Sequence, residues 1–340
     1  MIIWRLLEQE AVTSRRALLG GLIASGGALA LGGCAGMAES ATRPDVSALA
    51  TNPTMLVATT RKAVNGGRAN PWYGPERGST LSIAKARLAP PTSGAFSFVS
   101  AGDWRLDAVE PVAGRVNDLL AQATSGPDLL IYIHGYRNTF EGSALDAARL
   151  ADGIKFRGET MVFSWPSKAG FLDYAYDRES AVWSRDAFER VLTAAMANQN
   201  IGRIHIVAHS MGTLLALESL RQVYGRYGEA GADRIGAIIF ASPDIDVDVF
   251  ASSVARLGPL AQKMTVITAS NDRALALAGR VAGGVTRVGA ADREALAQLG
   301  LRVVDASALG FGIVNHDLFL SNGEMLRLIR RSVDNGGIAG

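Results

Sequence analysis

A serine in the second half of the chain has the sequence surroundings of a nucleophile. The apolar run Ile204–Ala208 predicts a buried strand, and the pattern over Met211–Tyr227 predicts a helix directly after it. Between them lies Ala208-His209-Ser210-Met211-Gly212, with a small residue two positions before and two after the serine. A serine on such a tight strand-to-helix turn presents its hydroxyl at the carboxyl edge of a sheet. The pattern predicts a nucleophile elbow at Ser210; an ordinary helix-capping serine is the alternative.

A serine hydroxyl needs a general base within hydrogen-bond reach, and the chain has 4 histidines. His205 lies inside the predicted strand, and the ring of His209, next to the serine, reaches back to the hydroxyl poorly. His134 ends an earlier strand. His316 is the one histidine after Ser210, and the chain order serine, acid, histidine is used by a large class of serine hydrolases. His316 is therefore the predicted general base; a surface histidine without a catalytic role is the alternative.

Two loops at predicted strand ends each offer a carboxylate that would orient His316 and stabilise its cation. Asp272 lies in one of these loops and Asp244 in the other. Asp244 also precedes a helical pattern and would start that helix, while Asp246 and Asp248 add favourable charge to its first turn. Asp272 is therefore the predicted third member of the triad, and Asp244 is the alternative.

An acyl-transfer site also needs two backbone N–H groups aimed at the developing negative charge. The N–H of Met211, directly after the serine, is one candidate. His134-Gly135-Tyr136 follows the strong strand Leu129–Ile133, and a glycine there lets the backbone turn toward the elbow. We expect the second donor to be the Tyr136 N–H.

The elements that must hold these residues alternate between strands and helices from residue 128 onward, which is typical of a parallel sheet covered on both faces. Residues 51–126 contain short strand and turn signals and are expected to pack on that sheet as an N-terminal strand extension. Strands are predicted at Met55–Thr59, Leu81–Leu88, Phe96–Val99, Leu129–Ile133, Thr160–Trp165, Ile204–Ala208, Ile235–Ala241, Met264–Ala269 and Leu301–Val304, and helices at Ser143–Phe156, Arg178–Asn198, Met211–Tyr227 and 318–331.

Several segments together resemble a bacterial α/β-hydrolase family of unknown function that is usually described as esterase- or lipase-like. The resemblance covers about residues 53–330. It implies an α/β-hydrolase fold, a serine-hydrolase triad and neither a metal nor an organic cofactor, but it supplies no substrate. The segments that carry it are Val57–Arg61, Ile131–Tyr136, Phe163–Ser167, Ala208–Gly212 and Ser270–Leu275.

The resemblance also bears on the choice between the two carboxylates. In this fold the acid usually follows the seventh strand, and in some members it follows the sixth. With the elbow strand counted as the fifth, Asp272 follows the seventh and Asp244 the sixth. The commoner position favours Asp272.

The N-terminus is typical of an export signal. Arg15-Arg16 precedes 22 uncharged residues, 17–38, and within them Leu31-Gly32-Gly33-Cys34 contains the 1 cysteine of the chain. This resembles a twin-arginine signal that ends in a lipobox, in which Cys34 is acylated. We expect a signal at 1–33, a tether at 34–50 and a catalytic core at 127–337. An uncleaved membrane anchor is the alternative, and both place the domain outside the cytoplasm on a membrane.

Composition narrows the class of protein. Of the 340 residues, 48% are hydrophobic and 19% are charged, and this composition excludes a disordered chain. The net charge is only +2, which disfavours a nucleic-acid partner. We predict a serine hydrolase that cleaves small-molecule or lipid carboxylic esters through an acyl-enzyme; the alternative is a catalytically idle envelope binding protein. Five aromatic residues cluster around the segment after the strand predicted at Thr160–Trp165. They either form a wall over an acyl site or belong to the ordinary packing of the core and helices: Trp165, Phe171, Tyr174, Tyr176 and Trp183.

Overall fold

The computed structural model describes residues 46–91, 103–123, 128–170, 172–281, 284–308 and 318–336. Four parts of the sequence interpretation lie outside these residues: the export signal with Cys34, the strand predicted at 96–99, Phe171, and the predicted base His316.

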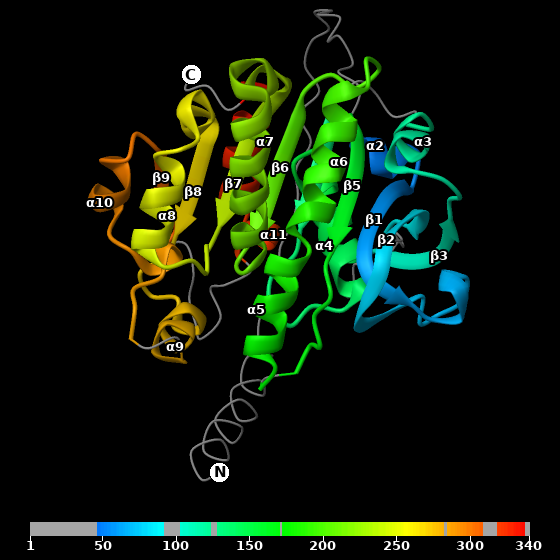
Figure 1. Cartoon of the computed structure of the whole chain (residues 1–340), viewed down its shortest axis with the longest axis horizontal. Helices are drawn as coiled ribbons and strands as arrows, with labels where there is room; N and C mark the ends of the chain where they lie inside the picture. The colour runs from blue at the N-terminus through cyan, green and yellow to red at the C-terminus, as the bar shows by residue number, and fades with distance from the viewer. Residues whose placement is uncertain are drawn as a thin grey trace, which may run out of the picture. The chain divides into compact units, whose positions relative to one another are not determined.

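A single nine-stranded sheet organises these residues, in the spatial order β3-β2-β1-β5-β4-β6-β7-β8-β9 (Figure 1). β1 pairs antiparallel with β2 and β2 with β3, whereas every pair from β1–β5 through β8–β9 is parallel. The sheet is therefore mostly parallel with an antiparallel N-terminal extension, as predicted. The strands are β1 (Thr54–Ala63), β2 (Tyr73–Ala89), β3 (Arg105–Pro111), β4 (Leu129–Ile133), β5 (Glu159–Ser164), β6 (Ile204–His209), β7 (Ile235–Ala241), β8 (Met264–Thr268) and β9 (Arg302–Asp305).

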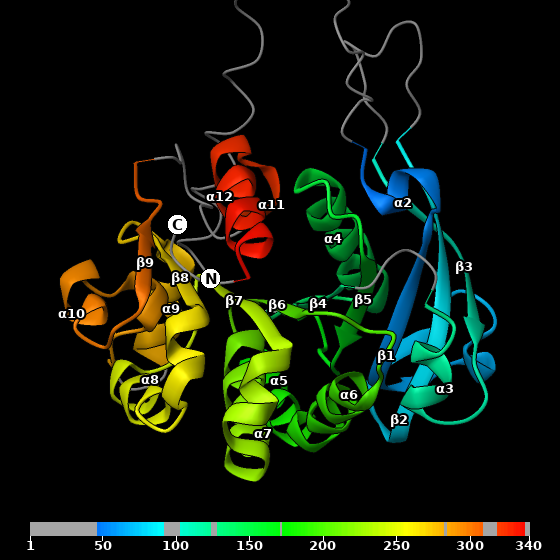
Figure 2. The same ribbon diagram turned by 90° about the horizontal axis from the view of Figure 1, so that it is seen from above.

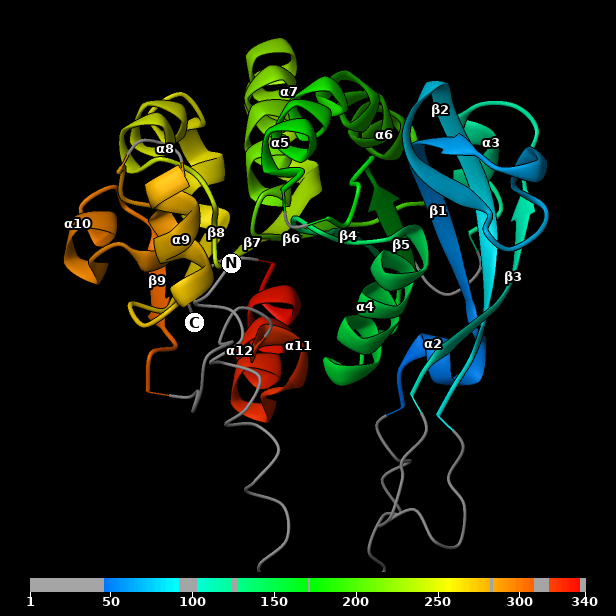
Figure 3. The ribbon, with the colours of Figure 1, turned by 90° about the horizontal axis from the view of Figure 1, so that it is seen from below.

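Helices cover both faces of the sheet. In Figures 2 and 3, α4, α11 and α12 lie on one side, and α5, α6 and α7 lie on the other. In the part of the chain that the structure describes, no helix is long and apolar enough to cross a membrane. The helices are α2 (Ala48–Thr51), α3 (Val116–Leu120), α4 (Phe140–Gly153), α5 (Tyr174–Trp183), α6 (Arg185–Ala197), α7 (Gly212–Arg234), α8 (Val247–Val254), α9 (Arg273–Val281), α10 (Arg293–Ala297), α11 (Leu318–Ser321) and α12 (Gly323–Asp334).

The alternation of side chains along β4 shows how the sheet divides the core. Leu129, Ile131 and Ile133 are fully buried in the apolar cluster that includes α6 and α7. Leu130 and Tyr132 are buried in the cluster on the other face, with α4 and α12. Successive strand residues point to opposite faces, so a strand covered on both sides must be apolar throughout. This packing fixes the carboxyl end of β4, which carries the His134-Gly135-Tyr136 turn.

Two local predictions need correction. The helix expected over Arg178–Asn198 is instead two helices, α5 and α6, which meet at Ser184. The Oγ of Ser184 donates to Ser180 O at 2.8 Å and lies 2.9 Å from Thr60 Oγ1. The helix expected to end at Tyr227 is interrupted directly after that residue, at Gly228 with a φ of +57°, and helical structure then resumes as far as Arg234. Gly228 directly follows the predicted end at Tyr227 and marks the interruption, whereas no glycine or proline marks the boundary at Ser184.

Candidate active site

Ser210 lies on the turn between β6 and α7, and its backbone adopts a φ of +50°. Residues other than glycine rarely occupy this region, so surrounding contacts must hold the conformation. The Ser210 N–H donates to Ala241 O at 2.9 Å, and Ser210 O accepts the Asp244 N–H at 3.2 Å and the Thr213 N–H at 3.1 Å. The residue is 2% exposed. The end of β7, the loop after it and the first turn of α7 therefore hold the strained turn.

Glycines allow the end of β4 to approach this turn closely. A Cβ added to Gly212 would lie 2.3 Å from the carbonyl oxygen of His134. A Cβ on Gly135 would lie 2.9 Å from Ser210 Cβ and 2.9 Å from His209 Nδ1. No side chain fits at either position without moving backbone or the serine itself. The His134-Gly135-Tyr136 turn thus lies directly against Ser210.

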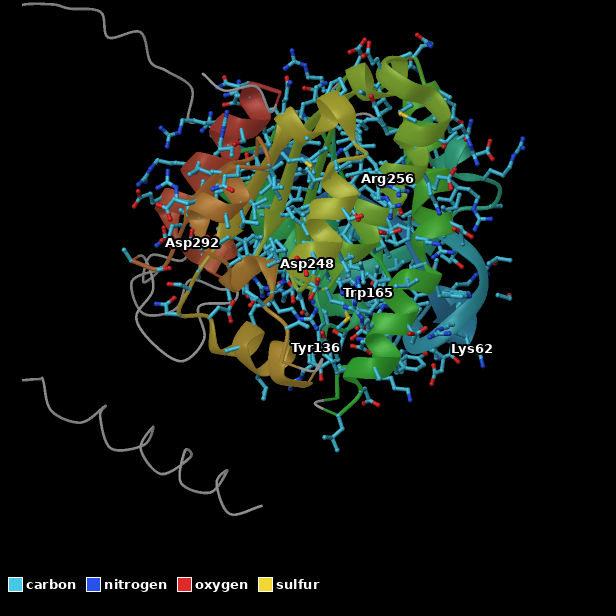
Figure 4. The ribbon with its side chains drawn as sticks, turned by 60° about the vertical axis from the view of Figure 1, so that its left-hand side comes forward. Lys62, Tyr136, Trp165, Asp248, Arg256 and Asp292 are labelled. Atoms are coloured by element: carbon cyan, nitrogen blue, oxygen red, sulfur yellow. The ribbon has the colours of Figure 1, made fainter. Side chains whose placement is uncertain are left out.

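The two predicted oxyanion donors come from these two segments. Met211 is fully buried and immediately precedes α7, so its N–H lies at the positive end of a helix dipole. Tyr136 follows Gly135, and its phenol donates to Gly170 O at 2.9 Å. Burial and the nearby Asp177 raise the pKa of that phenol above its usual range. In the view of Figure 4, Tyr136 lies between the ribbons of α9 and α5.

The three described histidines have partners elsewhere in the fold. His205 accepts the Ala237 N–H on Nδ1 at 3.1 Å, and its Nε2 lies 3.7 Å from a carboxylate oxygen of Asp128. The ring of His209 packs on Phe319, with 4.8 Å between the ring centres. His134 is buried against Trp165. His316 therefore remains the candidate base as a prediction from the sequence.

Asp272 lies at the start of α9 and is 2% exposed. Its Oδ1 accepts the N–H groups of Ala274 at 2.9 Å and Leu275 at 3.1 Å, which is the bonding of a helix N-cap. The carboxylate is thus held at a defined place at the carboxyl edge of the sheet, after β8.

The sequence interpretation of Asp244 as the start of the next helix is wrong. The residue that caps α8 is Asp246, whose Oδ1 accepts the N–H groups of Asp248 at 2.9 Å and Val249 at 3.1 Å. The carboxylate of Asp244 is instead 2% exposed and directed into the protein.

Asp244 belongs to a buried polar cluster that sequence reasoning missed. Its Oδ1 lies 3.1 Å from Arg287 Nε, without the alignment of a hydrogen bond, and its Oδ2 accepts the Tyr174 hydroxyl at 2.9 Å. Arg287 also donates to the Tyr174 oxygen at 3.3 Å. Burial and the Asp244 charge raise the pKa of Tyr174 to about 12, so the phenol stays protonated and continues to donate. These partners lie far apart in the chain, so no local pattern could reveal them.

The aromatic residues after β5 have separate roles. Trp165 is fully buried and stacks on the His134 ring, so it belongs to the core. Tyr174 packs edge-on against Tyr136, with 5.5 Å between ring centres and 71° between ring planes. Tyr176 and Trp183 instead face the guanidinium of Arg77, at 5.2 and 5.7 Å from their ring centres. Of these aromatic residues that the structure describes, only Tyr174 lies beside the site, against Tyr136.

Among the described residues, no three His, Cys, Asp or Glu side chains gather in a way that could hold a metal ion. The constellation that the structure does describe is a strained serine, a carboxylate after β8 and two candidate amide donors. A mostly parallel sheet with such a serine elbow at its carboxyl edge is the α/β-hydrolase fold.

The chain belongs to the family described as alpha/beta hydrolase of unknown function (DUF900), whose model matches residues 114–332. This confirms the family resemblance that the sequence motifs indicate. The match begins after β3, so the antiparallel extension lies outside it.

Individual relatives are more distant. An uncharacterized protein of Nostoc sp., alr1448, is 28% identical over 120 residues, which cover 28% of this chain and 31% of that protein. The chain thus matches about a third of the length of this curated relative. A hydrolase from Oleispira antarctica is 10% identical with a TM-score of 0.38, over 66% of this chain and 99% of the other. Est1E from Butyrivibrio proteoclasticus is 11% identical with a TM-score of 0.40, over 74% and 96%.

Proposed function

We propose that this protein is a serine hydrolase that cleaves carboxylic esters. Ser210 Oγ attacks the ester carbonyl carbon while His316 takes its proton, and Asp272 orients His316. The Met211 and Tyr136 N–H groups stabilise the oxyanion of the tetrahedral intermediate. Collapse of the intermediate expels the alcohol, which receives the proton from His316, and water then hydrolyses the acyl-enzyme. The substrates are small-molecule or lipid esters, and no cofactor takes part.

The observation that carries this proposal is the conformation of Ser210. A serine that only capped α7 would have no need of a φ of +50°, because N-cap residues adopt an extended backbone. Strain of about 1–3 kcal/mol is characteristic of residues that a fold holds for chemistry. The close approach of Gly135 to Ser210 adds a backbone segment where an oxyanion would form.

The polar partners of the two carboxylates support Asp272 over Asp244. Asp244 is committed to the buried cation Arg287, which needs its charge, and to the half-buried Tyr174, whose hydroxyl donates to it. If Asp244 held the catalytic histidine instead, the guanidinium of Arg287 would lose that partner. Asp272 is bonded to backbone amides at a helix start, a setting that suits a carboxylate kept ionised beside an imidazolium.

A fluorophosphonate probe tests the nucleophile directly, because it phosphonylates a serine that an adjacent base activates. We expect the wild type to be labelled at Ser210 and Ser210→Ala to be unlabelled, as measured by mass spectrometry of the labelled peptide. Ser219→Ala is the matched control: this buried serine of α7 donates to Leu215 O of its own helix at 2.9 Å and to Arg185 O of α6 at 3.0 Å. A folded wild type that takes no label would favour the idle binding protein.

Hydrolysis of p-nitrophenyl esters from acetate to palmitate then defines the acyl group. A serine hydrolase of this kind releases p-nitrophenol from at least one member of the series. If the probe labels the protein but no ester of the series is hydrolysed, the substrate is another acyl donor, such as a thioester.

We also propose that the protein is an extracytoplasmic lipoprotein anchored to a membrane through Cys34. Cys34→Ser is expected to abolish acylation and to move the protein from the membrane fraction to the soluble fraction, because the acylated Cys34 is the proposed attachment to the membrane. The measurement is fractionation with mass analysis of the mature N-terminus. Met37→Ser, a change outside the lipobox, serves as the control. A Cys34→Ser protein that stays on the membrane and keeps residues 1–33 would establish the uncleaved anchor.

A further inference from the structure

Arg61, at the carboxyl end of β1, is a buried cation behind the site. Its side chain is 1% exposed, and burial lowers its pKa to about 10, so it remains charged at neutral pH. Its side chain has five hydrogen-bond partners, all of them neutral groups, on three segments of the chain: residue 74, residues 134–138 and residues 164–167. They are Ser164 Oγ at 2.9 Å, Ser167 O at 3.1 Å, Gly74 O at 3.3 Å, Asn138 O at 2.7 Å and His134 Nε2 at 3.4 Å.

Two of these partners belong to the segment that follows β4. Asn138 and His134 lie at the two ends of the 134–138 segment, which includes the Tyr136 N–H. Further bonds hold the same segment: Trp165 Nε1 donates to His134 O at 2.8 Å, and Asn138 N donates to Ser167 Oγ at 3.2 Å. A buried charge that places two of its five bonds at the two ends of one turn is well suited to fix the shape of that turn.

The imidazole of His134 is neutral, because burial and the Arg61 charge lower its pKa well below the usual range. A neutral imidazole carries one N–H proton, and the hydrogen-bond partners of the ring determine whether it is on Nδ1 or on Nε2. Nε2 faces two donors, the Arg61 guanidinium and the Trp165 N–H at 3.1 Å, as well as Trp165 O at 3.1 Å. Nδ1 faces Gly135 O at 2.8 Å, and a carbonyl can only accept. A proton on Nδ1 satisfies three of these four contacts, whereas a proton on Nε2 satisfies one.

The bond from His134 Nδ1 to Gly135 O sets the plane of the next peptide unit. The Gly135–Tyr136 peptide is trans, since the one cis bond recorded is Asn70–Pro71. In a trans peptide the C=O and the N–H point in opposite directions. Because Gly135 O points to the imidazole, the Tyr136 N–H of the same peptide points away from it. Gly135, at the other end of this peptide, packs against Ser210.

We propose that Arg61 and His134 are positioning residues of the oxyanion hole: Arg61 holds His134 as its Nδ1–H tautomer, and this N–H aims the Tyr136 amide. The inference rests on the proposed function, in which Tyr136 is an oxyanion donor. Neither side chain touches the substrate. Their contribution is to hold an amide in place before charge develops, so that no reorganisation is needed during the reaction.

Two substitutions separate the two nitrogens of His134. In His134→Asn the side-chain amide can still donate where Nδ1 does, and in His134→Gln it can still accept where Nε2 does. We expect His134→Gln to lower kcat by about 10²-fold or more with little change in KM, and His134→Asn to stay within about tenfold of wild type. A trifluoromethyl ketone, which adds to Ser210 Oγ and leaves an oxyanion, should lose affinity in parallel with kcat/KM.

A merely structural role predicts a different result, in which both variants lose activity in step with their thermal midpoints. That outcome, or a His134→Gln variant as active as wild type, would overturn the inference. The tautomer gives a second test that needs no variant to fold or react. In the ¹⁵N-histidine-labelled full chain, we expect His134 to carry its proton on Nδ1; a proton on Nε2 would refute the proposal.

The serine-hydrolase activity and the positioning role of His134 can be refuted separately. If the wild type takes no fluorophosphonate, the serine-hydrolase proposal fails and this inference fails with it. If the wild type is labelled and hydrolyses esters while His134→Gln matches it, the hydrolase stands and only the positioning role is lost.

Discussion

Asp272→Asn is expected to lower kcat by about 10⁴-fold, by analogy with other serine triads, while the protein stays about as stable as wild type. Asparagine caps helices as well as aspartate does, so its Oδ1 can keep the two α9 amides that Asp272 accepts. In the proposed triad the carboxylate accepts a hydrogen bond from the His316 imidazole, and an amide would offer a donor there as well. The variant should be folded and nearly inactive.

Asp244→Asn is the matched comparison and should behave in the opposite way. It removes the charge that faces Arg287, and both groups are at most 3% exposed. Leaving one member of a buried ion pair uncompensated costs about 3 kcal/mol or more. We therefore expect a large fall in the thermal midpoint, with kcat close to wild type where the protein is folded.

Measuring kcat and the midpoint of both variants side by side decides which carboxylate is catalytic. Loss of rate in Asp272→Asn together with loss of stability in Asp244→Asn supports the assignment. If Asp244→Asn is the inactive variant and Asp272→Asn keeps its rate, the acid follows β7 and the assignment is wrong.

Ser210→Ala is expected to lower kcat by at least about 10³-fold on the best ester of the series. The change removes the nucleophile while the contacts that hold the turn remain, since those bonds involve the backbone N–H and C=O of Ser210. The thermal midpoint should therefore change little. Ser219→Ala, measured in the same assay, controls for the loss of a buried hydroxyl. A reduction in kcat of less than tenfold would show that Ser210 is not the nucleophile.

The sequence by itself determined the parts of this protein that depend on neighbouring residues. Four of the strands around the site, β4, β6, β7 and β8, could be recognised because a strand buried on both faces is apolar along most of its length. The elbow at Ser210 is likewise local, since the strand, the turn and the helix follow one another without a gap. The family match over 114–332 agrees with this local information.

Only the tertiary structure decided which polar groups meet. Asp244 and Asp272 look alike in sequence, each following a strand, yet one is paired with the distant Arg287 and the other binds the amides of its own helix. Ser184, where α5 ends and α6 begins, likewise contacts Thr60 of β1, and Arg61 reaches His134 across the sheet. These contacts join segments far apart in the chain, and a buried polar group takes whichever partner the packing of the sheet brings within reach. Side-chain periodicity reports which face of an element is buried and carries no information about that partner.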